Sequence, residues 1–153
     1  MLDANFDGTV IYLFDTGDGT AGVVLNRPTA IPVTDVLPGL TAALAEPAVV
    51  FHGGPVQVEH GVVLGLADSE IHVLDVEAAA DATCESARVF AGYAGWEAGQ
   101  LKGEIDAGGW FVIDATSGDI LTPDPGGLWR AVFARQPGAI RWYRNFPDDP
   151  RLN

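Results

Sequence analysis

The sequence predicts one α+β domain with a mainly antiparallel sheet. Short apolar runs rich in β-branched and aromatic residues recur along the chain, and Gly, Pro and Asp separate them. Helical periodicity is confined to a few stretches. The length of 153 residues suits one domain, and no repeat, linker or low-complexity segment divides it. We therefore expect a single domain over residues 1–153.

The N-terminal part predicts a β-hairpin. Residues 9–14 (TVIYLF) form the expected first strand, residues 15–20 (DTGDGT) the turn, and residues 21–26 (AGVVLN) the return strand. We expect Pro28 and Pro32 to end the strand pairing, because proline has no N–H to donate to a neighbouring strand.

Residues 17–22 of this hairpin match the G-x-G-x-x-G pattern of nucleotide-binding loops. That pattern works by presenting the N-terminus of a helix to a pyrophosphate. Here a β-branched strand follows instead, so we interpret the glycines as turn residues.

The middle of the chain predicts short helices and three strands. Thr34 or Asp35 is a candidate N-cap of a short helix that Pro38 interrupts, and residues 41–46 are a candidate continuation. The expected strands are residues 48–52, 61–67 and 70–76, with a glycine–proline corner at residues 53–55 between the first two.

The C-terminal half predicts alternating strands and helices. Ala98, Leu101 and Ile105 form an apolar stripe, which favours an amphipathic helix that ends at Gly108. The other expected elements are a short helix or loop at 77–86, strands at 88–93 and 110–114, a last helix around 128–133, and an aromatic tail at 139–153 packed on the body.

The charge balance restricts the class of partner. The chain has 8 basic and 21 acidic residues, a net charge of −13, and Arg27 is the only base among the first 87 residues. An acidic surface repels the phosphate backbone, so direct nucleic-acid binding is not expected. No apolar run approaches the ~20 residues of a membrane span, and the single cysteine, Cys84, permits no internal disulfide. We expect a cytoplasmic protein without a membrane anchor.

Three groups of polar residues beside glycine or proline are candidate binding elements, because strand ends on a rigid sheet commonly carry sites. The candidate ligand-binding residues are Asn26, Arg27, His52, Gly53, Gly54, Pro55, Trp96 and Gln100. Arg27 has two interpretations, an ion pair that fixes the turn before Pro28 or a guanidinium that clamps a carboxylate or phosphate. In the second, the N–H groups of Gly53 and Gly54 are further donors.

The histidines give an alternative, catalytic reading. His52 and His60 would face each other if the strands on either side of the corner formed a hairpin, and either could then act as the general base of a hydrolase. No serine lies in a G-x-S-x-G motif, and two histidines are too few for a structural zinc site. We expect no metal, no cofactor and no assigned catalytic residue.

Four segments in order resemble the YqgE/AlgH family of bacterial proteins. They are GVVLNRP (22–28), GGPV (53–56), GYAGWEAGQLKGEI (92–105) and the helix around Trp129, and NFPDDPRLN (145–153) resembles the ending found in high-GC Gram-positive bacteria. The resemblance implies an α+β domain in which a small, closed, barrel-like sheet branches into flanking strands surrounded by helices. It implies no catalytic residues, and the AlgH name suggests a regulatory role.

The resemblance also indicates a difference at the N-terminus. Relatives carry a further strand before the segment that resembles residues 1–6, and its absence would leave one sheet edge uncovered and open to self-association. Three functions therefore compete. The first is a binding or regulatory module with a cleft for a small anionic ligand or a peptide, the second is a hydrolase using His52 or His60, and the third is a structural module for protein association.

Overall fold

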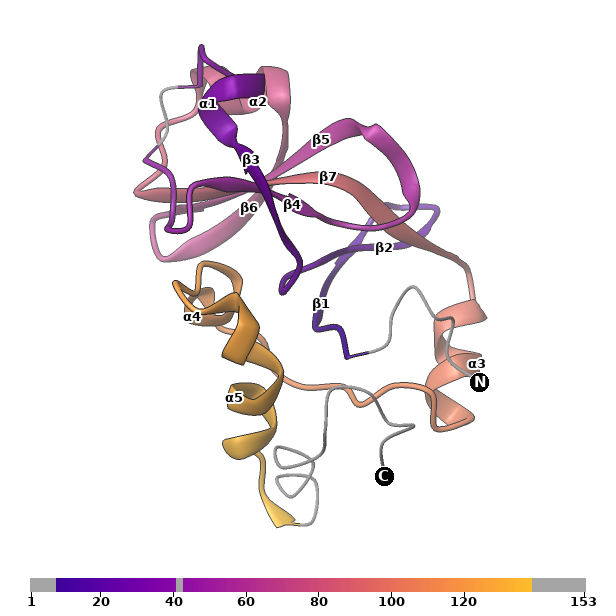
Figure 1. The fold of residues 1–153 in the computed structure, drawn as a ribbon. Helices are drawn as coiled ribbons and strands as arrows, with labels where there is room; N and C mark the ends of the chain where they lie inside the picture. The colour runs from indigo at the N-terminus through magenta and orange to yellow at the C-terminus, as the bar shows by residue number, and fades with distance from the viewer. Residues whose placement is uncertain (1–7, 41–42, 139–153) are drawn as a thin grey trace.

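The computed structural model describes residues 8–40 and 43–138, and these form a 3₁₀ helix (Pro125–Gly127), seven strands and five short α-helices (Figure 1). In chain order they are β1 (Ile11–Asp15), β2 (Gly19–Val24), β3 (Pro28–Pro32), α1 (Val33–Val36), β4 (Val49–His52), β5 (Val56–Ala67), β6 (Glu70–Asp75), α2 (Val76–Asp81), β7 (Ser86–Glu97), α3 (Gln100–Asp106), α4 (Ser117–Ile120) and α5 (Leu128–Ala134). None of these helices is long and apolar enough to cross a membrane.

The long strand β7 organises the sheet. In its first half β4 runs parallel to it on one side and β5 antiparallel on the other, with Phe51 and Val62 both opposite Phe90. Its last residues pair with β2, where Thr20 lies opposite Trp96. The strand order is β1-β2-β7-β4-β3, and β5 with β6 branches from β7.

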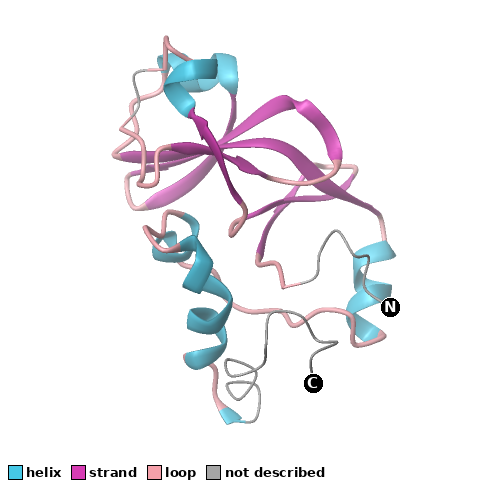
Figure 2. Ribbon diagram, in the orientation of Figure 1, coloured by secondary structure: helices cyan, strands magenta, loops and turns pink. Residues whose placement is uncertain are grey.

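The sheet branches but does not close, so the expected barrel-like core is wrong. Within the described residues β1, β3 and β6 each pair with one neighbour and not with one another, and Figure 2 shows the strands spreading apart from β7. Closure requires every edge to find a partner. Here β7 changes partners along its length near Gly92, which has a φ of 77°, and the strands diverge from that point.

The predicted N-terminal hairpin is confirmed. β1 and β2 pair antiparallel from Ile11 opposite Val24 to Asp15 opposite Thr20. The glycines of the G-x-G-x-x-G pattern occupy the turn and β2, and β3 rather than a helix follows β2, which confirms the turn interpretation.

The expectation that two prolines end the pairing is wrong. Pro28 lies opposite Phe51 and Pro32 opposite Val49, so these prolines are the ends of β3. β3 is an edge strand, and proline is tolerated there because the strand can still accept hydrogen bonds. The bond at the start of this pair runs from the His52 N–H to the Arg27 carbonyl over 2.8 Å.

The two faces of the sheet carry separate apolar clusters. Phe51, Leu64 and Phe90 point to one face and pack with the residues of α4 and α5, which are Ile120, Leu128, Val132 and Phe133. Val50, Val63 and Val89 point to the other face and pack with Val33 of α1 and Ala79 of α2. Figure 1 accordingly shows α1 and α2 together at one end and α4 with α5 below the sheet. This arrangement follows the alternation of side chains along each strand.

Several predicted elements have different bounds. The helix after β3 begins at Val33, and its N-cap is Pro32 without a side-chain bond, so Thr34 and Asp35 are not caps. Residues 41–42 lie outside the described residues, and the rest of the candidate helix 41–46 is not helical, since Leu44 bridges to Ala87 of β7. The tail at 139–153 also lies outside the described residues.

The predicted strand at 110–114 is wrong, whereas the helices on either side of it are confirmed as α3 and α5. The β-branched and aromatic composition favours extended backbone, but no strand among residues 8–40 and 43–138 pairs with this segment. The side chains of Phe111 and Val112 are accordingly 48% and 70% exposed. Composition predicts the local conformation, and pairing depends on a neighbour that composition does not supply.

One arginine is part of the core. Arg88 of β7 is 2% exposed, and it donates to the Ile120 carbonyl over 3.1 Å and to the Glu46 carbonyl over 2.7 Å. Its guanidinium lies 4.4 Å from the centre of the Phe51 ring. Burial lowers the pKa of Arg88 to about 10. The side chain thereby joins the sheet, the segment before β4, and α4.

Candidate functional site

Arg27 and His52 form the first group of candidate residues. The pairing of Pro28 with Phe51, together with the bond from the His52 N–H to the Arg27 carbonyl, places Arg27 directly opposite His52. Side chains directly opposite in an antiparallel pair lie on the same face about 5 Å apart at Cβ. Phe51 points into the core, so His52 points to the other face, where it is exposed, and Arg27 is half-buried. Arg27 and His52 therefore form a cross-strand pair whose side chains leave the backbone on the same face of the sheet.

The glycine corner lies next to this pair, but both backbone groups of Gly53 are already hydrogen-bonded. The Gly53 N–H donates to the Ala91 carbonyl and the Gly53 carbonyl accepts from the Val24 N–H, both over 2.8 Å. A Cβ on Gly53 would lie 2.4 Å from the Gly92 oxygen, and one on Gly54 2.2 Å from the Tyr93 carbonyl carbon. The expectation that the Gly53 N–H donates to a ligand is wrong, because it donates to the Ala91 carbonyl of β7. Pro55 is exposed beside them.

Asn26 acts on the neighbouring chain segment. Its Oδ1 accepts the N–H of Val10 over 3.0 Å, and its Nδ2 donates to the carbonyl of Gly8 over 2.9 Å. Both ends of the amide are thus bonded to backbone. Asn26 fixes the approach to β1 and the orientation of the turn that carries Arg27.

Trp96 and Gln100 belong to a second group. Trp96 is 6% exposed, and its Nε1 donates to Glu104 Oε2 over 3.0 Å. Trp110 donates to the same oxygen over 2.8 Å, while Gln100 lies 3.4 Å from Oε1. The Trp110 N–H is the main cause that holds the pKa of Glu104 below its usual value. Partial burial acts against it, and the bonds from Trp96 and Gln100 add to the lowering.

The two groups lie on different parts of β7. Trp96 is four residues beyond Gly92, which packs on Gly53 and Gly54, and four strand residues span roughly 13 Å. The strand register therefore brings Arg27, His52 and the glycine corner together and places Trp96 and Gln100 farther along the chain, at and beyond the end of β7. The four-residue spacing of Gln100 and Glu104 places them on one face of α3, whereas no sequence pattern indicates the bond from Trp110 to Glu104.

His60 does not face His52. β4 and β5 lie on opposite sides of β7 and do not form a hairpin with each other, which corrects that expectation. The His60 Nδ1 lies 2.8 Å from Gln57 Oε1, next to a β-bulge between Val56 and Gly61. Neither imidazole is bonded to a serine, cysteine or carboxylate among the described residues, and these residues hold no group of three or more His, Cys, Asp or Glu suited to a metal.

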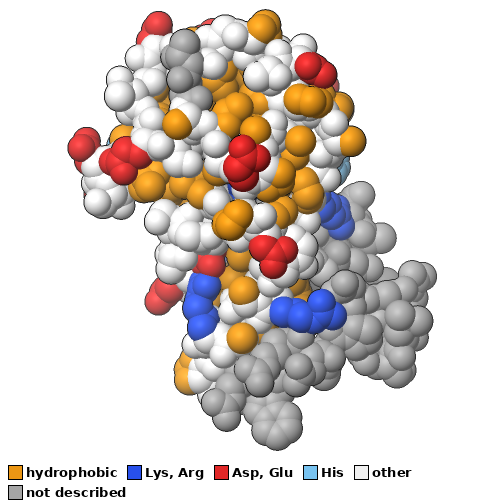
Figure 3. All heavy atoms as spheres, turned by 60° about the vertical axis from the view of Figure 1, so that its left-hand side comes forward, with side chains coloured by type: hydrophobic (Ala, Val, Ile, Leu, Met, Phe, Trp, Pro, Cys, Tyr) orange, Lys and Arg blue, Asp and Glu red, His pale blue; other side chains and the backbone are white. Residues whose placement is uncertain are grey.

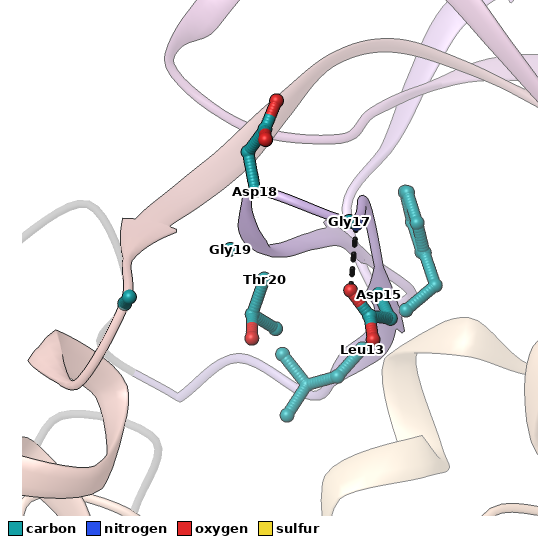
Figure 4. A pocket seen from close by; sticks show the side chains of 8 residues that line it. Leu13, Asp15, Gly17, Asp18, Gly19 and Thr20 are labelled. Carbon is teal, nitrogen blue, oxygen red and sulfur yellow. Dashed lines mark hydrogen bonds between the residues drawn. The ribbon is translucent and has the colours of Figure 1, made fainter.

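A shallow pocket of about 440 Å³ lies at the β1–β2 turn (Figure 4). Asp15, Gly17, Asp18 and Thr20 are among the residues that line it, and Asp15 Oδ1 accepts the Gly17 N–H over 2.7 Å. No lining residue is basic. Because two carboxylates repel anions, this pocket does not suit a phosphate, in agreement with the turn interpretation of its glycines.

Fold and surface define a small mixed α+β domain in which Arg27 and His52 lie opposite each other where β3 meets β4, beside a packed glycine corner. Residues 1–141 match the family described as AlgH-like, and the chain belongs to that family. This confirms the family inferred from the four sequence segments.

Relatives in actinobacteria are similar over the whole chain. Proteins of Streptomyces avermitilis and Thermobifida fusca, both named only as UPF0301 proteins, are 39% and 38% identical, and the alignments cover 100% of this chain and 90% of each relative. A relative from Mycobacterium avium is 37% identical, with 86% of its length covered.

Two solved structures share the fold. The crystal structure of a Corynebacterium diphtheriae protein has a TM-score of 0.85 and 27% identity, with 95% of this chain and 86% of that one covered. The solution structure of the AlgH protein from Pseudomonas aeruginosa has a TM-score of 0.71 and 28% identity, with 95% and 87% covered.

Proposed function

We propose that this protein is a cytoplasmic binding module that recognises a small anion, or the carboxylate of a peptide, at Arg27 and His52. The observation that carries the proposal is the cross-strand position of these two residues, fixed by the bond between the His52 N–H and the Arg27 carbonyl. A guanidinium offers a planar fork of donors to a carboxylate or phosphate, and an imidazole adds a further donor.

The surroundings support a ligand with few charges. Arg27 is the only basic residue in the first 87, among thirteen acids. A polyanion such as a nucleic acid would meet repulsion from those acids, whereas a single carboxylate or phosphate group would interact mainly with the Arg27–His52 pair. A regulatory role would then consist of sensing such a ligand.

The hydrolase alternative has less support. A histidine base needs a nucleophile or an activated water within hydrogen-bond reach. In residues 8–40 and 43–138 the bond of His60 goes to Gln57, an amide that neither attacks a substrate nor activates water. We therefore favour binding over catalysis.

Thermal unfolding with inorganic phosphate and with citrate tests the proposal. A bound anion raises the stability by RT ln(1 + [L]/Kd). Arg27→Ala and His52→Ala should each remove the stabilisation, and Arg27→Lys should weaken it because an ammonium lacks the planar fork. Lys102→Ala is the matched control, since Lys102 is an exposed cation on α3 paired with Asp106.

Isothermal titration calorimetry of the same variants then measures affinity directly. Loss of binding in the Arg27 and His52 variants with retention in the Lys102 variant supports the proposal. The absence of any effect of either anion on the wild type, or an equal loss in all three variants, contradicts it.

A further inference from the structure

β1, β3 and β6 are the three edge strands among the described residues, and the two that flank the first half of β7, β3 and β6, differ in how they are protected. β3 is an edge that begins and ends with proline, and the Thr29 hydroxyl accepts the Ile31 N–H. These features remove donors that a new strand would need. β6, at the opposite edge, has neither proline nor glycine, and its six residues pair with β5 in unbroken register.

The β5–β6 turn fixes which groups of β6 face outward. Asp68 and Ser69 have φ values of 52° and 66°, as in a two-residue type I′ turn, so Ala67 and Glu70 form the first hydrogen-bonded pair. Bonded and non-bonded pairs then alternate along the hairpin, which turns the N–H and C=O groups of Ile71 and Val73 away from β5. The Leu66 carbonyl, opposite Ile71, accordingly points to the β7 side and accepts the Glu85 N–H over 2.8 Å.

The outward side of β6 is open among the described residues. No backbone bond outside the β5–β6 ladder reaches Ile71 or Val73, and the Val73 side chain is 39% exposed. An edge with free donors and acceptors and a flanking apolar side chain is the geometry that accepts an added strand.

The stretch of chain that carries this edge is acidic, which indicates the charge of a partner. Residues 53–87 contain no lysine or arginine, and their acidic residues are Glu59, Asp68, Glu70, Asp75, Glu77, Asp81 and Glu85. Figure 3 shows red and orange side chains together over the upper part of that face, with blue ones lower down. A second copy would carry the same net charge of −13 and be repelled, whereas a basic segment would be attracted.

We propose that the outer edge of β6 is a docking site for an extended, lysine- or arginine-rich segment of another protein. The segment adds as a strand through the outward backbone groups of Ile71 and Val73, and its basic side chains meet the acids at both ends of β6. This surface is distinct from the Arg27–His52 pair, which lies across the sheet beyond β7 and β4, and it does not depend on the anion proposal.

A blocked peptide of alternating lysine and valine, six residues long, is the probe, and a glutamate–valine peptide of the same length is its control. Two-dimensional NMR of the whole chain should show shifted and exchange-protected amides at Ile71 and Val73 with the lysine peptide only. Raising the salt from 50 to 500 mM should weaken binding, because exposed charges are screened. Equal binding of both peptides, protection at β3 instead, or no binding of the lysine peptide at millimolar concentration overturns the proposal.

Two variants distinguish the contribution of the backbone hydrogen bonds to peptide binding from that of the acidic side chains. Val73→Pro deletes the outward N–H and leaves the inward bonds of His72 and Leu74, and Val73→Thr is its matched control; we expect about tenfold weaker binding for the proline variant alone. Glu70→Lys with Glu77→Lys reverses the charge without changing the edge and should weaken binding about as much, which keeps the test valid if the proline variant does not fold. Unchanged affinity in the charge-reversed protein contradicts the proposal, as does self-association that rises with the concentration of the wild type.

Discussion

Trp96 and Trp110 donate their indole N–H groups to the same atom, Glu104 Oε2, over 3.0 and 2.8 Å. Their rings meet edge to face with centres 6.0 Å apart. Trp96 lies at the end of β7, Glu104 on α3 and Trp110 on the segment after α3. One carboxylate therefore holds α3 and its following segment against the sheet.

We expect Glu104→Gln to lower the free energy of unfolding by about 1 kcal/mol and Glu104→Ala by about 2 kcal/mol. Hydrogen bonds to a charged acceptor are stronger than those to a neutral one, and alanine removes the acceptor altogether. Urea unfolding measures both values. Glu97→Gln, an exposed acid at the end of β7, is the control and should stay within about 0.5 kcal/mol of the wild type. A Glu104→Ala variant as stable as that control would contradict the structural role.

The contribution of Glu104 should depend on pH. The indole N–H groups hold its pKa below the usual value when the protein is folded. A depressed folded pKa adds stability above the unfolded pKa, and that stability is lost as the pH falls through the folded pKa. The difference between wild type and Glu104→Gln should therefore be constant near neutral pH and shrink in the acid range below 4.5. Urea unfolding at a series of pH values measures it, and a difference that grows toward acid would contradict the expected sign.

Much of the fold could be predicted because local pattern and tertiary structure agree there. The β1–β2 hairpin combines β-branched runs with a glycine and aspartate turn, and α3 combines an apolar stripe with a glycine stop. The wrong predictions concern strands whose pairing partners are far away in the sequence. Nothing in the sequence around Pro28 indicates that it begins an edge strand, and nothing in residues 110–114 indicates that no strand among the described residues pairs with them.

The candidate site could be predicted only in part, for a related reason. Asn26, Arg27 and the glycine corner are adjacent because β3 pairs with β4 and β4 pairs with β7. The sequence indicated only the residue types of a site, which are an arginine able to bind an anion and glycines that allow close approach of the backbone. The sequence could not show that the Gly53 N–H is used by Ala91, nor that Trp96 lies about four residues farther along β7. Those facts depend on register, which single-sequence patterns do not encode.

Asp119 and Arg135 form a second testable pair. Arg135 donates to both carboxylate oxygens of Asp119, over 2.6 and 2.5 Å, and Asp119 also closes a capping box with Thr116 at the start of α4. Burial acts to raise the pKa of Asp119, but the bonds from Arg135 and Thr116 outweigh it and the pKa is lowered. α4 and α5 cover the same face of the sheet, so the pair links two helices of one core.

We expect Asp119→Asn to lower the free energy of unfolding by about 2 kcal/mol and Arg135→Ala by about 1 kcal/mol, because Asp119 is buried whereas Arg135 is 38% exposed. A double-mutant cycle should give a coupling of about 1 kcal/mol. If the two changes in the free energy of unfolding are strictly additive, the bonds from Arg135 to Asp119 contribute nothing beyond the capping box of Asp119 with Thr116.

Gly53 separates a structural from a ligand-binding role for the corner. A Cβ at this position would lie 2.4 Å from the Gly92 carbonyl oxygen, and backbone cannot move aside as a side chain can. We expect Gly53→Ala to lower the free energy of unfolding by about 2 kcal/mol or more, as overpacked sites do. Gly95→Ala is the matched control on β7, since its nearest contact would be ordinary at 3.8 Å, and it should change stability by less than about 0.5 kcal/mol.

Urea unfolding gives the stabilities, and titration with phosphate at a temperature where both variants are folded gives the affinities. If the corner is structural, the folded Gly53→Ala protein binds phosphate as the wild type does, because Arg27 and His52 keep their own side chains. A variant of normal stability that loses phosphate binding would instead show that the Gly53 backbone contacts the ligand.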